Sequence, residues 1–289
     1  MRRACPSLQS TGRSGSSRCS GTMAGPASTD LGRALCVITG ASRGFGRAIA
    51  RDMSRLVKPG SALVLTARSA EDLRSLQVEL AESEAGRAGL LLRCVAADLS
   101  RQDGLESIVR AAKEAFCEDM DHVVLVNNAA SLGDVSRLAS SFSDLTEVDS
   151  YLSLNVGSAL CLTAAVLQAF PRRAGRRRCV VNVTSLCALQ PFSSWVLYCT
   201  GKAAREMTFR VLAEEEPDLR VLNYSPGPLD TAMQAQARST TADPGVRESF
   251  LDMFAGGRLL SCEASCAKLM TVLLEDRYTS GAHVDVYEL

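Results

Sequence analysis

The sequence predicts a single α/β domain, a doubly wound parallel sheet of seven strands with helices on both faces. Three observations support this prediction. From Ala34 onward, short apolar runs alternate with longer segments of helical periodicity, which is the pattern of parallel strands joined by helical crossovers. A glycine-rich turn follows the first apolar run. At 289 residues, 46% of them hydrophobic, the chain can form one large core and needs no second domain.

The seven predicted strands are mostly continuous in apolar residues, as expected for strands buried on both faces of a sheet. They are Leu35–Thr39, Ala62–Ala67, Leu90–Ala96, Val123–Asn127, Val180–Val183, Arg220–Tyr224 and His283–Tyr287. Helices are expected to fill the gaps between them. Ligands should then bind at the carboxyl ends of the strands, where open α/β sheets form their crevices.

The first 32 residues are predicted to be a disordered extension ahead of a domain that spans residues 33–289. Residues 1–22 contain four arginines and no acidic residue, are rich in serine and glycine, and lack hydrophobic periodicity. This composition also suits a mitochondrial transit peptide, but it has no amphipathic stripe. We favour a dispensable extension, with Met23 as an alternative start, and a cytoplasmic protein.

The charge balance argues against a polyanionic partner. The chain has 32 basic and 32 acidic residues and a formal net charge of zero, so neither nucleic acid nor a membrane surface is expected. No run approaches the roughly 18 consecutive apolar residues of a membrane span. The 11 cysteines are scattered through the predicted elements and are expected to be reduced; no histidine has zinc-ligand spacing with Cys262 and Cys266, so no metal is expected.

Two segments interrupt the alternation of strands and helices. The basic run Arg172–Arg178 contains no aromatic residue and follows Pro171, so we expect a solvated turn rather than a nucleic-acid patch. The segment Asp230–Gly257 is polar and follows a proline-rich turn. It lies where such a sheet can carry a mobile lid over its ligand, and it can equally be an ordered helical excursion.

The glycine-rich turn between the first strand and the first helix is expected to bind a dinucleotide. Gly40 allows a tight turn, Gly44 lets the backbone approach a pyrophosphate, and Gly46 permits close helix packing. The helix N-terminus adds free N–H groups. The candidate contacts are Gly40, Ala41, Ser42, Arg43, Gly44, Phe45 and Gly46. The strand–turn–helix context adds weight to the motif and indicates a Rossmann-like fold.

The residue after the second strand favours NADP(H) over NAD(H). A carboxylate at this point binds the ribose 2′-hydroxyl, whereas an arginine accommodates a 2′-phosphate. This chain has Arg68 there, followed by Ser69. Arg43 in the glycine turn can add a second guanidinium, whose geometry matches phosphate. The alternative is that either arginine is only an exposed surface residue.

Residues at the ends of the third and fourth strands are expected to frame the adenosine. Asp98 and Leu99 close the third strand, and Asn127 and Asn128 close the fourth. Both pairs lie at the edge of the sheet where ligands bind. Asn127 can also be a polar strand terminus with no ligand role.

Tyr198 and Lys202 are four residues apart and therefore share one face of a predicted helix. Reduction of a carbonyl needs a proton for the oxygen as hydride reaches the carbon, and a free tyrosine has a pKa of about 10. A neighbouring ammonium group lowers that pKa. Ser185, just past the fifth strand, can donate to the substrate carbonyl, although a serine there can also satisfy local backbone groups.

These motifs, in this order, resemble the short-chain dehydrogenase/reductase family, from Ala34 to the C-terminus. The resemblance implies that Ser185, Tyr198 and Lys202 are catalytic, that Lys202 also holds the nicotinamide ribose, and that Asn155 supports a proton-relay water. It further implies cofactor contacts after the sixth strand from Leu229, Asp230, Thr231, Ala232, Met233 and Gln234. One departure is Ala130, where the family has glycine. Its methyl group affects the adenosine side of the site and not the chemistry.

Four segments resemble, more specifically, the pterin-reducing members of this family. They are Gly40–Gly46, Ser185–Phe192, Asn223–Thr231 and Ser280–Asp285. The resemblance implies NADPH-dependent reduction of pterin side-chain ketones, such as that of 6-pyruvoyl-tetrahydropterin, in tetrahydrobiopterin synthesis, and it implies a homodimer. The pterin would contact Ser185, Tyr198, Gly227 and Asp285. A carboxylate accepts hydrogen bonds from the adjacent N–H groups of an aminopyrimidinone, which suits Asp285 as the anchor.

Several points stay open at the level of sequence. Leu186, Phe192, Trp195 and Met233 can form the walls for a flat ligand or belong to the core. A broad-specificity NADPH carbonyl reductase of the same family is an alternative function, because the catalytic residues do not depend on the rest of the substrate. A non-catalytic NADP(H)-binding regulator is another, and the complete Ser185–Tyr198–Lys202 set argues against it.

Overall fold

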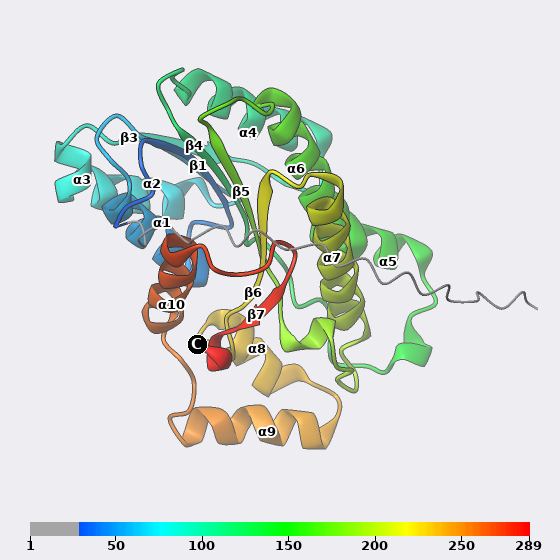
Figure 1. Cartoon of the computed structure of the whole chain (residues 1–289). Coiled ribbons are helices and arrows are strands. Elements are labelled where there is room, and N and C mark those ends of the chain that lie inside the picture. The colour runs from blue at the N-terminus through cyan, green and yellow to red at the C-terminus, as the bar shows by residue number, and fades with distance from the viewer. Residues whose placement is uncertain (1–28) are drawn as a thin grey trace, which may run out of the picture.

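Seven strands form one parallel sheet at the centre of the molecule (Figure 1). The computed structural model describes residues 29–289. Across the sheet the order is β3-β2-β1-β4-β5-β6-β7, with every neighbouring pair parallel. The bounds are β1 Ala34–Thr39, β2 Ala62–Ala67, β3 Leu91–Ala96, β4 His122–Asn127, β5 Arg177–Val183, β6 Leu219–Ser225 and β7 His283–Asp285. The predicted fold class is confirmed.

Helices cover both faces of this sheet. α1, α2 and α10 pack on one face, and α4, α6 and α7 pack on the other (Figure 1). The helices are α1 Gly44–Leu56, α2 Ala70–Ala81, α3 Glu84–Arg87, α4 Gln102–Ala115, α5 Leu145–Leu152, α6 Ser158–Ala169, α7 Val196–Glu215, α8 Ala232–Thr240, α9 Pro244–Ala255 and α10 Cys262–Glu275. Shorter helical turns are η1 Ala139–Ser141, η2 Ser153–Gly157, η3 Leu186–Ala188 and η4 Val286–Glu288.

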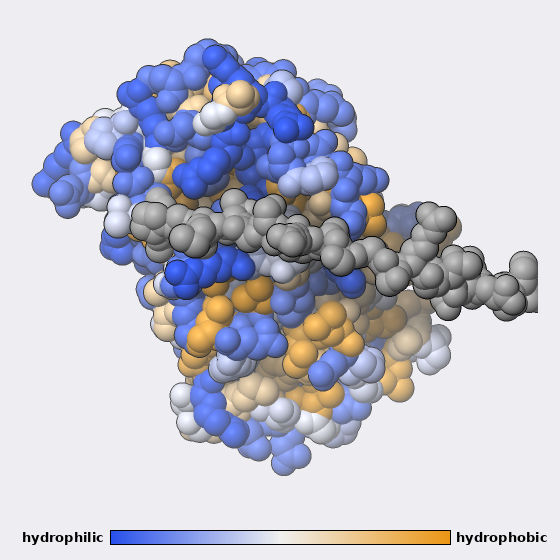
Figure 2. Space-filling view, in the orientation of Figure 1, coloured by the Kyte–Doolittle hydropathy of each residue, from blue (hydrophilic) through white to orange (hydrophobic). Residues whose placement is uncertain are grey.

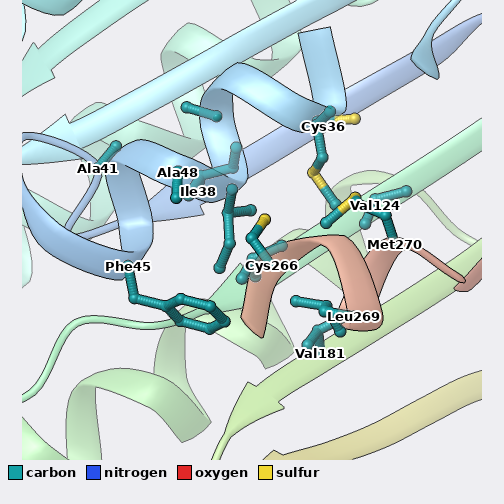
Figure 3. Close-up of a cluster of buried hydrophobic side chains, with 14 of the residues drawn as sticks. Cys36, Ile38, Ala41, Phe45, Ala48, Val124, Val181, Cys266, Leu269 and Met270 are labelled. Atoms are coloured by element: carbon teal, nitrogen blue, oxygen red, sulfur yellow. The ribbon is translucent and has the colours of Figure 1, made fainter. Parts of the chain in front are cut away.

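Two hydrophobic layers flank the sheet, which explains why the strands are apolar along their whole length. In β1, Cys36 and Ile38 point toward α1 and α10, as Figure 3 shows for this layer. The residues between them, Leu35 and Val37, belong to the opposite layer under α4 and α6. All four are 0% exposed. Full burial of such a side chain contributes about 1.5–3 kcal/mol, so both faces of β1 stabilise the fold.

The chain order reverses at β1, which pairs with β2 on one side and β4 on the other. In open α/β sheets a crevice forms outside the carboxyl ends of the strands at such a point. In this fold α8 and α9 lie beyond the same end of the sheet (Figure 1). The fold therefore brings the glycine turn after β1 and the α8–α9 segment to one edge.

Helices α8 and α9 correspond to the predicted excursion at Asp230–Gly257, and the helical alternative is confirmed. Thr231 caps α8 by accepting from the backbone N–H of Gln234, and Asp243 caps α9 by accepting from that of Val246. Pro244 occupies the first turn of α9, where its missing N–H costs nothing. Ordered caps at both starts define two separate helices.

The last strand is shorter than predicted. β7 ends at Asp285, and η4 begins directly after it. Asp285 accepts from the backbone N–H of Tyr287, while Glu288 accepts from the backbone N–H of Asp285, which forms a capping box. The alternating pattern of His283–Tyr287 suggested a longer strand, but this cap turns the chain at Asp285.

The prediction of a solvated turn at Arg172–Arg178 is wrong at its C-terminal end. Arg177 and Arg178 begin β5, and Arg178 is only 5% exposed. Its guanidinium pairs with Glu216 at 2.8 Å and with Asp218 at 3.1 Å. Carboxylates distant in sequence compensate the buried charge, which a local reading of the run could not anticipate.

The predicted extension at 1–32 lies mostly outside the described residues, which begin at 29. The predicted boundary at residue 33 is late. Leu31 is 3% exposed and belongs to the core, and its backbone N–H donates to the carbonyl of Leu56 at 2.7 Å. The ordered domain therefore includes Leu31.

Within the described residues, the segment Leu145–Ala169 is long and apolar enough to cross a membrane by length and composition alone. It comprises α5, η2 and α6. Leu162 and Val166 are each 1% exposed and pack against the sheet. Thr163 is also buried and accepts a hydrogen bond from Asn127. These contacts are those of a core helix in a globular domain.

Candidate active site

A cavity of about 1100 Å³ opens at the carboxyl ends of the strands. Its lining includes the glycine turn after β1, the ends of β5 and β6, the α8–α9 segment and the C-terminal turn η4. In Figure 2 hydrophobic residues gather on the part of this face that lies over β7 and α8, whereas the face over α4 is mainly hydrophilic. The cavity is large enough for a dinucleotide and a small second ligand.

The glycine turn has the backbone that its sequence predicts. Gly40 and Gly44 have φ angles of +66° and +55°, a region that residues with a side chain seldom adopt. A Cβ at Gly46 would lie 2.2 Å from the carbonyl oxygen of Gly40. The turn is therefore built for backbone approach to a ligand and close helix packing, which fits a dinucleotide pyrophosphate.

The N-terminus of α1 faces this turn without a side-chain cap. Arg43 is the N-cap residue, it makes no capping hydrogen bond, and the first turn of α1 contains no acidic residue. Ser42 and Phe45 are buried and also line the cavity. Uncapped N–H groups at a helix N-terminus attract anions, so this end of α1 suits a phosphate.

Arg68 and Ser69, at the end of β2, line the same cavity as Arg43. Neither arginine forms an ion pair with a carboxylate in the described part of the chain. Ser69 caps α2 by accepting from the backbone N–H of Asp72. Two arginines that line one cavity and form no ion pair there can bind a phosphate.

Four of the predicted residues do not line the cavity: Ala41, Asp98, Asn127 and Asn155. Ala41 is 0% exposed, and its backbone N–H donates to Thr66. Asp98 is exposed and accepts hydrogen bonds from Ser100, which hold the pKa of its carboxyl below the ordinary value. Its neighbour Leu99 does line the cavity.

Asn127 points into the protein rather than toward a ligand. It is 2% exposed, and its Nδ2 donates to Thr163 Oγ1 at 2.9 Å. This hydrogen bond favours the alternative that Asn127 is a polar strand terminus, and its contact with the cofactor stays a prediction. Asn128 lines the cavity instead and donates to the carbonyls of Thr39 and Gly40. Asn128 is the second of the two asparagines expected at the end of this strand.

The six predicted residues after β6 all line the cavity: Leu229, Asp230, Thr231, Ala232, Met233 and Gln234. Thr231 caps α8, as described above. Gln234 is 5% exposed, and its Nε2 donates to the carbonyl of Phe250 on α9 at 3.0 Å. This contact joins α8 to α9 at the wall of the cavity.

Ser185, Tyr198 and Lys202 meet in the cavity as predicted from their spacing. Ser185 accepts from the backbone N–H of Cys187 at 3.2 Å, which leaves its own hydroxyl proton free to donate. The hydroxyls of Ser185 and Tyr198 are hydrogen-bonded to each other. Lys202 Nζ donates to the carbonyl of Val183 at 2.7 Å and lies 5.5 Å from the centre of the Tyr198 ring.

The expected lowering of the Tyr198 pKa is not found, because burial outweighs the charges around the hydroxyl. Burial raises the pKa of the Tyr198 hydroxyl, while the hydrogen bond from Ser185 and the charge of Arg205 lower it. Burial, followed by the charge of Arg205, lowers the pKa of Lys202 well below its ordinary value. Desolvation dominates because both side chains are buried, at 9% and 5% exposed.

Asn155 lies in η2, a π-helical turn between α5 and α6. It is 3% exposed; its Nδ2 donates to the carbonyl of Tyr151, and its Oδ1 accepts from the backbone N–H of Ser131 at 2.8 Å. π-helical turns inside α-helices are frequent at functional sites. The side chain fixes the loop after β4 beside the catalytic helix.

An aromatic cluster lies beside Tyr198. Trp195 meets the Tyr198 ring edge-on at 5.5 Å and stacks on Phe250 of α9 at 5.0 Å. Its Nε1 donates to Thr241 Oγ1 at 3.0 Å. Four side chains that the sequence offered as ligand walls or core all line the cavity: Leu186, Phe192, Trp195 and Met233. Trp195 lines the cavity and also belongs to the core, since it is only 4% exposed.

Asp285 and Gly227 line the cavity near the C-terminal turn. Ser225 Oγ donates to Asp285 Oδ2 at 2.7 Å, and Oδ1 accepts from the backbone N–H of Tyr287 at 3.0 Å. Gly227 has a φ angle of +75°, and a Cβ there would lie 2.9 Å from Val286. These contacts hold the Asp285 carboxylate at a fixed orientation. Sequence reasoning missed Ser225, although it lies in a segment with family resemblance.

Cys187 and Cys199, which flank the catalytic positions, are hydrogen-bonded to each other. This hydrogen bond lowers the pKa of the Cys199 thiol to about 7 and raises that of Cys187. Sequence reasoning took both for packing thiols. Cys187 fits that description, since it is buried in the aromatic cluster, whereas Cys199 is partly exposed.

Comparison with known proteins agrees with this geometry. The short chain dehydrogenase family model matches residues 34–242. The crystal structure of L-sorbose reductase from Gluconobacter frateurii, complexed with NADPH and L-sorbose, has a TM-score of 0.73 at 25% identity and covers 89% of this chain and 96% of that chain. The chain therefore belongs to the short-chain dehydrogenase family.

Within this family the chain is similar to sepiapterin reductases. It is 51% identical to that of Bos taurus over 259 residues, which cover 89% of this chain and 96% of that protein. It is 50% identical to that of Xenopus tropicalis over 258 residues, which cover 89% of this chain and 98% of that protein.

Proposed function

We propose that this chain is an NADPH-dependent reductase of pterin side-chain ketones. Its substrates are sepiapterin, which it converts to L-erythro-7,8-dihydrobiopterin, and 6-pyruvoyl-tetrahydropterin in tetrahydrobiopterin synthesis. One observation carries the proposal: a single cavity contains both the hydrogen-bonded Ser185–Tyr198 pair and the Asp285 carboxylate. The similarity to sepiapterin reductases supports the choice of a pterin.

The cofactor is NADPH, and the residues present fit it. The glycine turn, where Gly46 leaves no room for a Cβ, receives the pyrophosphate with the N-terminus of α1. Arg68 and Arg43 bind the 2′-phosphate. When bound, NADPH supplies the hydride for the substrate carbon. Lys202 holds the nicotinamide ribose, and the residues Leu229–Gln234 close over the cofactor.

The pterin lies between the aromatic cluster and Asp285. The carboxylate accepts hydrogen bonds from the adjacent N–H groups of the aminopyrimidinone edge. Its orientation is set by Ser225 and the N–H of Tyr287. Gly227 contributes only backbone to this part of the site, because a Cβ there would lie 2.9 Å from Val286.

The chain's own chemistry is proton delivery to the ketone oxygen. Ser185 donates a hydrogen bond to that oxygen and stabilises its developing negative charge. Tyr198 transfers its hydroxyl proton to the same oxygen, so that the substrate becomes an alcohol and Tyr198 a phenolate. Asn155 positions the water that returns a proton to the site. Trp195 and Phe250 exclude bulk water from this step.

An anaerobic assay tests the proposal. NADPH oxidation is measured with sepiapterin, with 6-pyruvoyl-tetrahydropterin and with simple diketones, for the wild type and Asp285→Ala. We expect the variant to lose at least tenfold in kcat/KM for both pterins and to retain its rate with the diketones, since one hydrogen-bonded anchor is worth about 1.5–3 kcal/mol. Equal losses on all substrates, or no pterin reduction by the wild type, would refute it.

We also propose a homodimer that uses the outer faces of α6 and α7. Leu160 on α6, and Met207 and Val211 on α7, are 50%, 55% and 45% exposed. A groove of about 410 Å³ between α4 and α6 includes Cys161, which follows Leu160 in the sequence, and its lining is part apolar and part charged. Exposed apolar side chains on adjacent helices suit a second copy of the chain.

The oligomeric state is measured by light scattering coupled to gel filtration. We expect a dimer for the wild type and a monomer for the double variant Met207→Glu/Val211→Glu, because buried unpaired charges oppose association. A wild-type monomer at micromolar concentration would contradict the proposal.

For the cell we propose a cytoplasmic location. The nine described cysteines are free, and five of them are buried, which is typical of proteins from reducing compartments. Fluorescence microscopy of the tagged full chain checks this placement, and an organellar pattern would overturn it.

A further inference from the structure

Arg205 is a buried cation next to the catalytic residues. It belongs neither to the Ser185–Tyr198–Lys202 set nor to the reaction as proposed above. It is 2% exposed, and among the described residues it is the largest of the fully buried side chains. On α7 it follows Tyr198 by seven residues and Lys202 by three, so all three share one face of the helix. It does not line the cavity, and it therefore touches neither substrate nor cofactor.

All hydrogen-bond acceptors of Arg205 are neutral. Nε donates to Asn182 Oδ1 at 2.9 Å and Nη1 to the carbonyl of Ala129 at 3.0 Å, while Nη2 donates to the carbonyl of Asn127. No carboxylate of the described chain forms an ion pair with it. Burying a charge without a counter-charge costs several kcal/mol, and neutral side chains can cross-link elements at lower cost.

Arg205 stays charged despite this burial, which lowers the pKa of its guanidinium only to about 10. Its charge acts on three titratable neighbours, since it favours the ionised forms of Tyr198 and Tyr151 and lowers the pKa of Lys202. The titratable groups around Tyr198 come from three elements: Cys187 on η3; Cys199, Lys202 and Arg205 on α7; and Tyr151 on α5. Among them Arg205 is the cation that opposes the effect of burial on the Tyr198 hydroxyl.

We propose that Arg205 is a positioning residue for carbonyl reduction. Its guanidinium holds the end of β4 and the turn at Ala129 against α7, and its charge stabilises the phenolate that Tyr198 becomes after proton transfer. In that step the O–H bond of Tyr198 breaks, a new O–H bond forms on the substrate oxygen, and the electron pair stays on the phenolate. The inference rests on the proposed reductase activity and identifies Arg205 as the fixed positive charge that acts in it.

The test compares pH profiles of kcat for the wild type, Arg205→Met, Arg205→Lys and, as a matched control, Arg210→Met, which removes an exposed arginine from the same helix. A proton donor must be protonated, so the rate falls above the pKa of Tyr198. We expect Arg205→Met to move this alkaline limb upward by about one pH unit and to lower the plateau about tenfold, since one pKa unit corresponds to 1.36 kcal/mol. Arg205→Lys should restore the limb, and Arg210→Met should match the wild type.

A wild-type limb and plateau in folded Arg205→Met would overturn the proposal, and so would a loss of turnover in Arg205→Met and Arg205→Lys with no shift of the limb. Arg205→Gln keeps an amide donor and replaces Arg205→Met if that variant does not fold. Each variant is assayed with sepiapterin and a diketone. If the wild type reduces neither, the proposed function fails; if it reduces them and the profiles coincide, only the role of Arg205 fails.

Discussion

His283 Nδ1 lies 3.2 Å from Oε1 of Glu206, and this pair joins β7 to α7 at the wall of the cavity, which His283 lines. Glu206 is 4% exposed, and its second oxygen has no hydrogen-bond partner among the described residues. The hydrogen bond to Glu206 raises the pKa of His283. β7 carries Asp285 two residues further on, so the pair helps to fix the strand that presents the pterin anchor.

This pair makes stability depend on pH. Because the pKa of His283 is higher in the folded than in the unfolded state, its contribution is complete below about pH 6.5 and is lost as pH rises through the folded value. We expect Glu206→Gln to lower the free energy of unfolding by about 1–3 kcal/mol at pH 6 and by less at pH 8.5. Urea unfolding at both pH values measures it.

His122 makes stability depend on pH in the opposite direction, because burial lowers its pKa to about 4. Its contribution is present above about pH 6.5 and is lost toward acid, equally in the wild type and in Glu206→Gln. The difference between the two proteins therefore isolates His283. A difference that grew with pH would contradict the assignment.

Tyr198→Phe should abolish turnover without loss of cofactor. The ring remains against Trp195, while the hydroxyl that donates the proton is removed. We expect kcat to fall at least a hundredfold and the Kd for NADPH, measured by fluorescence titration, to change less than threefold. Substantial residual kcat would assign proton donation to another group.

Arg68→Ala should discriminate between the two nicotinamide cofactors. Loss of a charge-assisted hydrogen bond to the 2′-phosphate costs about 1.5–3 kcal/mol, so we expect the KM for NADPH to rise about 10- to 100-fold while that for NADH stays within twofold. Steady-state kinetics with each cofactor measure the change. Arg93→Ala, an exposed arginine on β3 outside the cavity lining, is the control. Parallel loss with both cofactors would mean that Arg68 does not recognise the phosphate.

Gly46→Ala should weaken cofactor binding, although the substitution adds only one methyl group. The new Cβ would lie 2.2 Å from the carbonyl oxygen of Gly40, so the turn must shift. We expect NADPH binding to weaken at least tenfold. Gly245→Ala, where the nearest atom is 3.5 Å away, is the matched control and should bind NADPH normally. Equal affinities for the two variants would show that the turn adapts without cost.

Local patterns were sufficient for the fold class, the glycine turn and the positions of Ser185, Tyr198 and Lys202. A strand buried on both faces must be apolar throughout, and β1 shows this directly, with alternate residues in opposite layers. The positive φ angles of Gly40 and Gly44 follow from local sequence, because glycine adopts them without steric cost. A four-residue spacing likewise puts Tyr198 and Lys202 on one face of any helix.

Long-range contacts decided the features that these patterns missed. Asn127 turned inward because Thr163 on α6 accepts its amide, and Arg178 became buried because Glu216 and Asp218 pair with it. The pKa of Tyr198 is set mainly by burial, which raises it, against the Ser185 hydroxyl and the charge of Arg205, which lower it.

The physical reason is that periodicity and backbone conformation are set within a few residues, whereas desolvation and ion pairing depend on which distant groups fill the space around a side chain. Arg205 shows the difference: it bonds Asn127 and Ala129, which lie 78 and 76 residues away along the chain. No pattern around position 205 reveals either contact, and only folding brings that charge to the catalytic tyrosine.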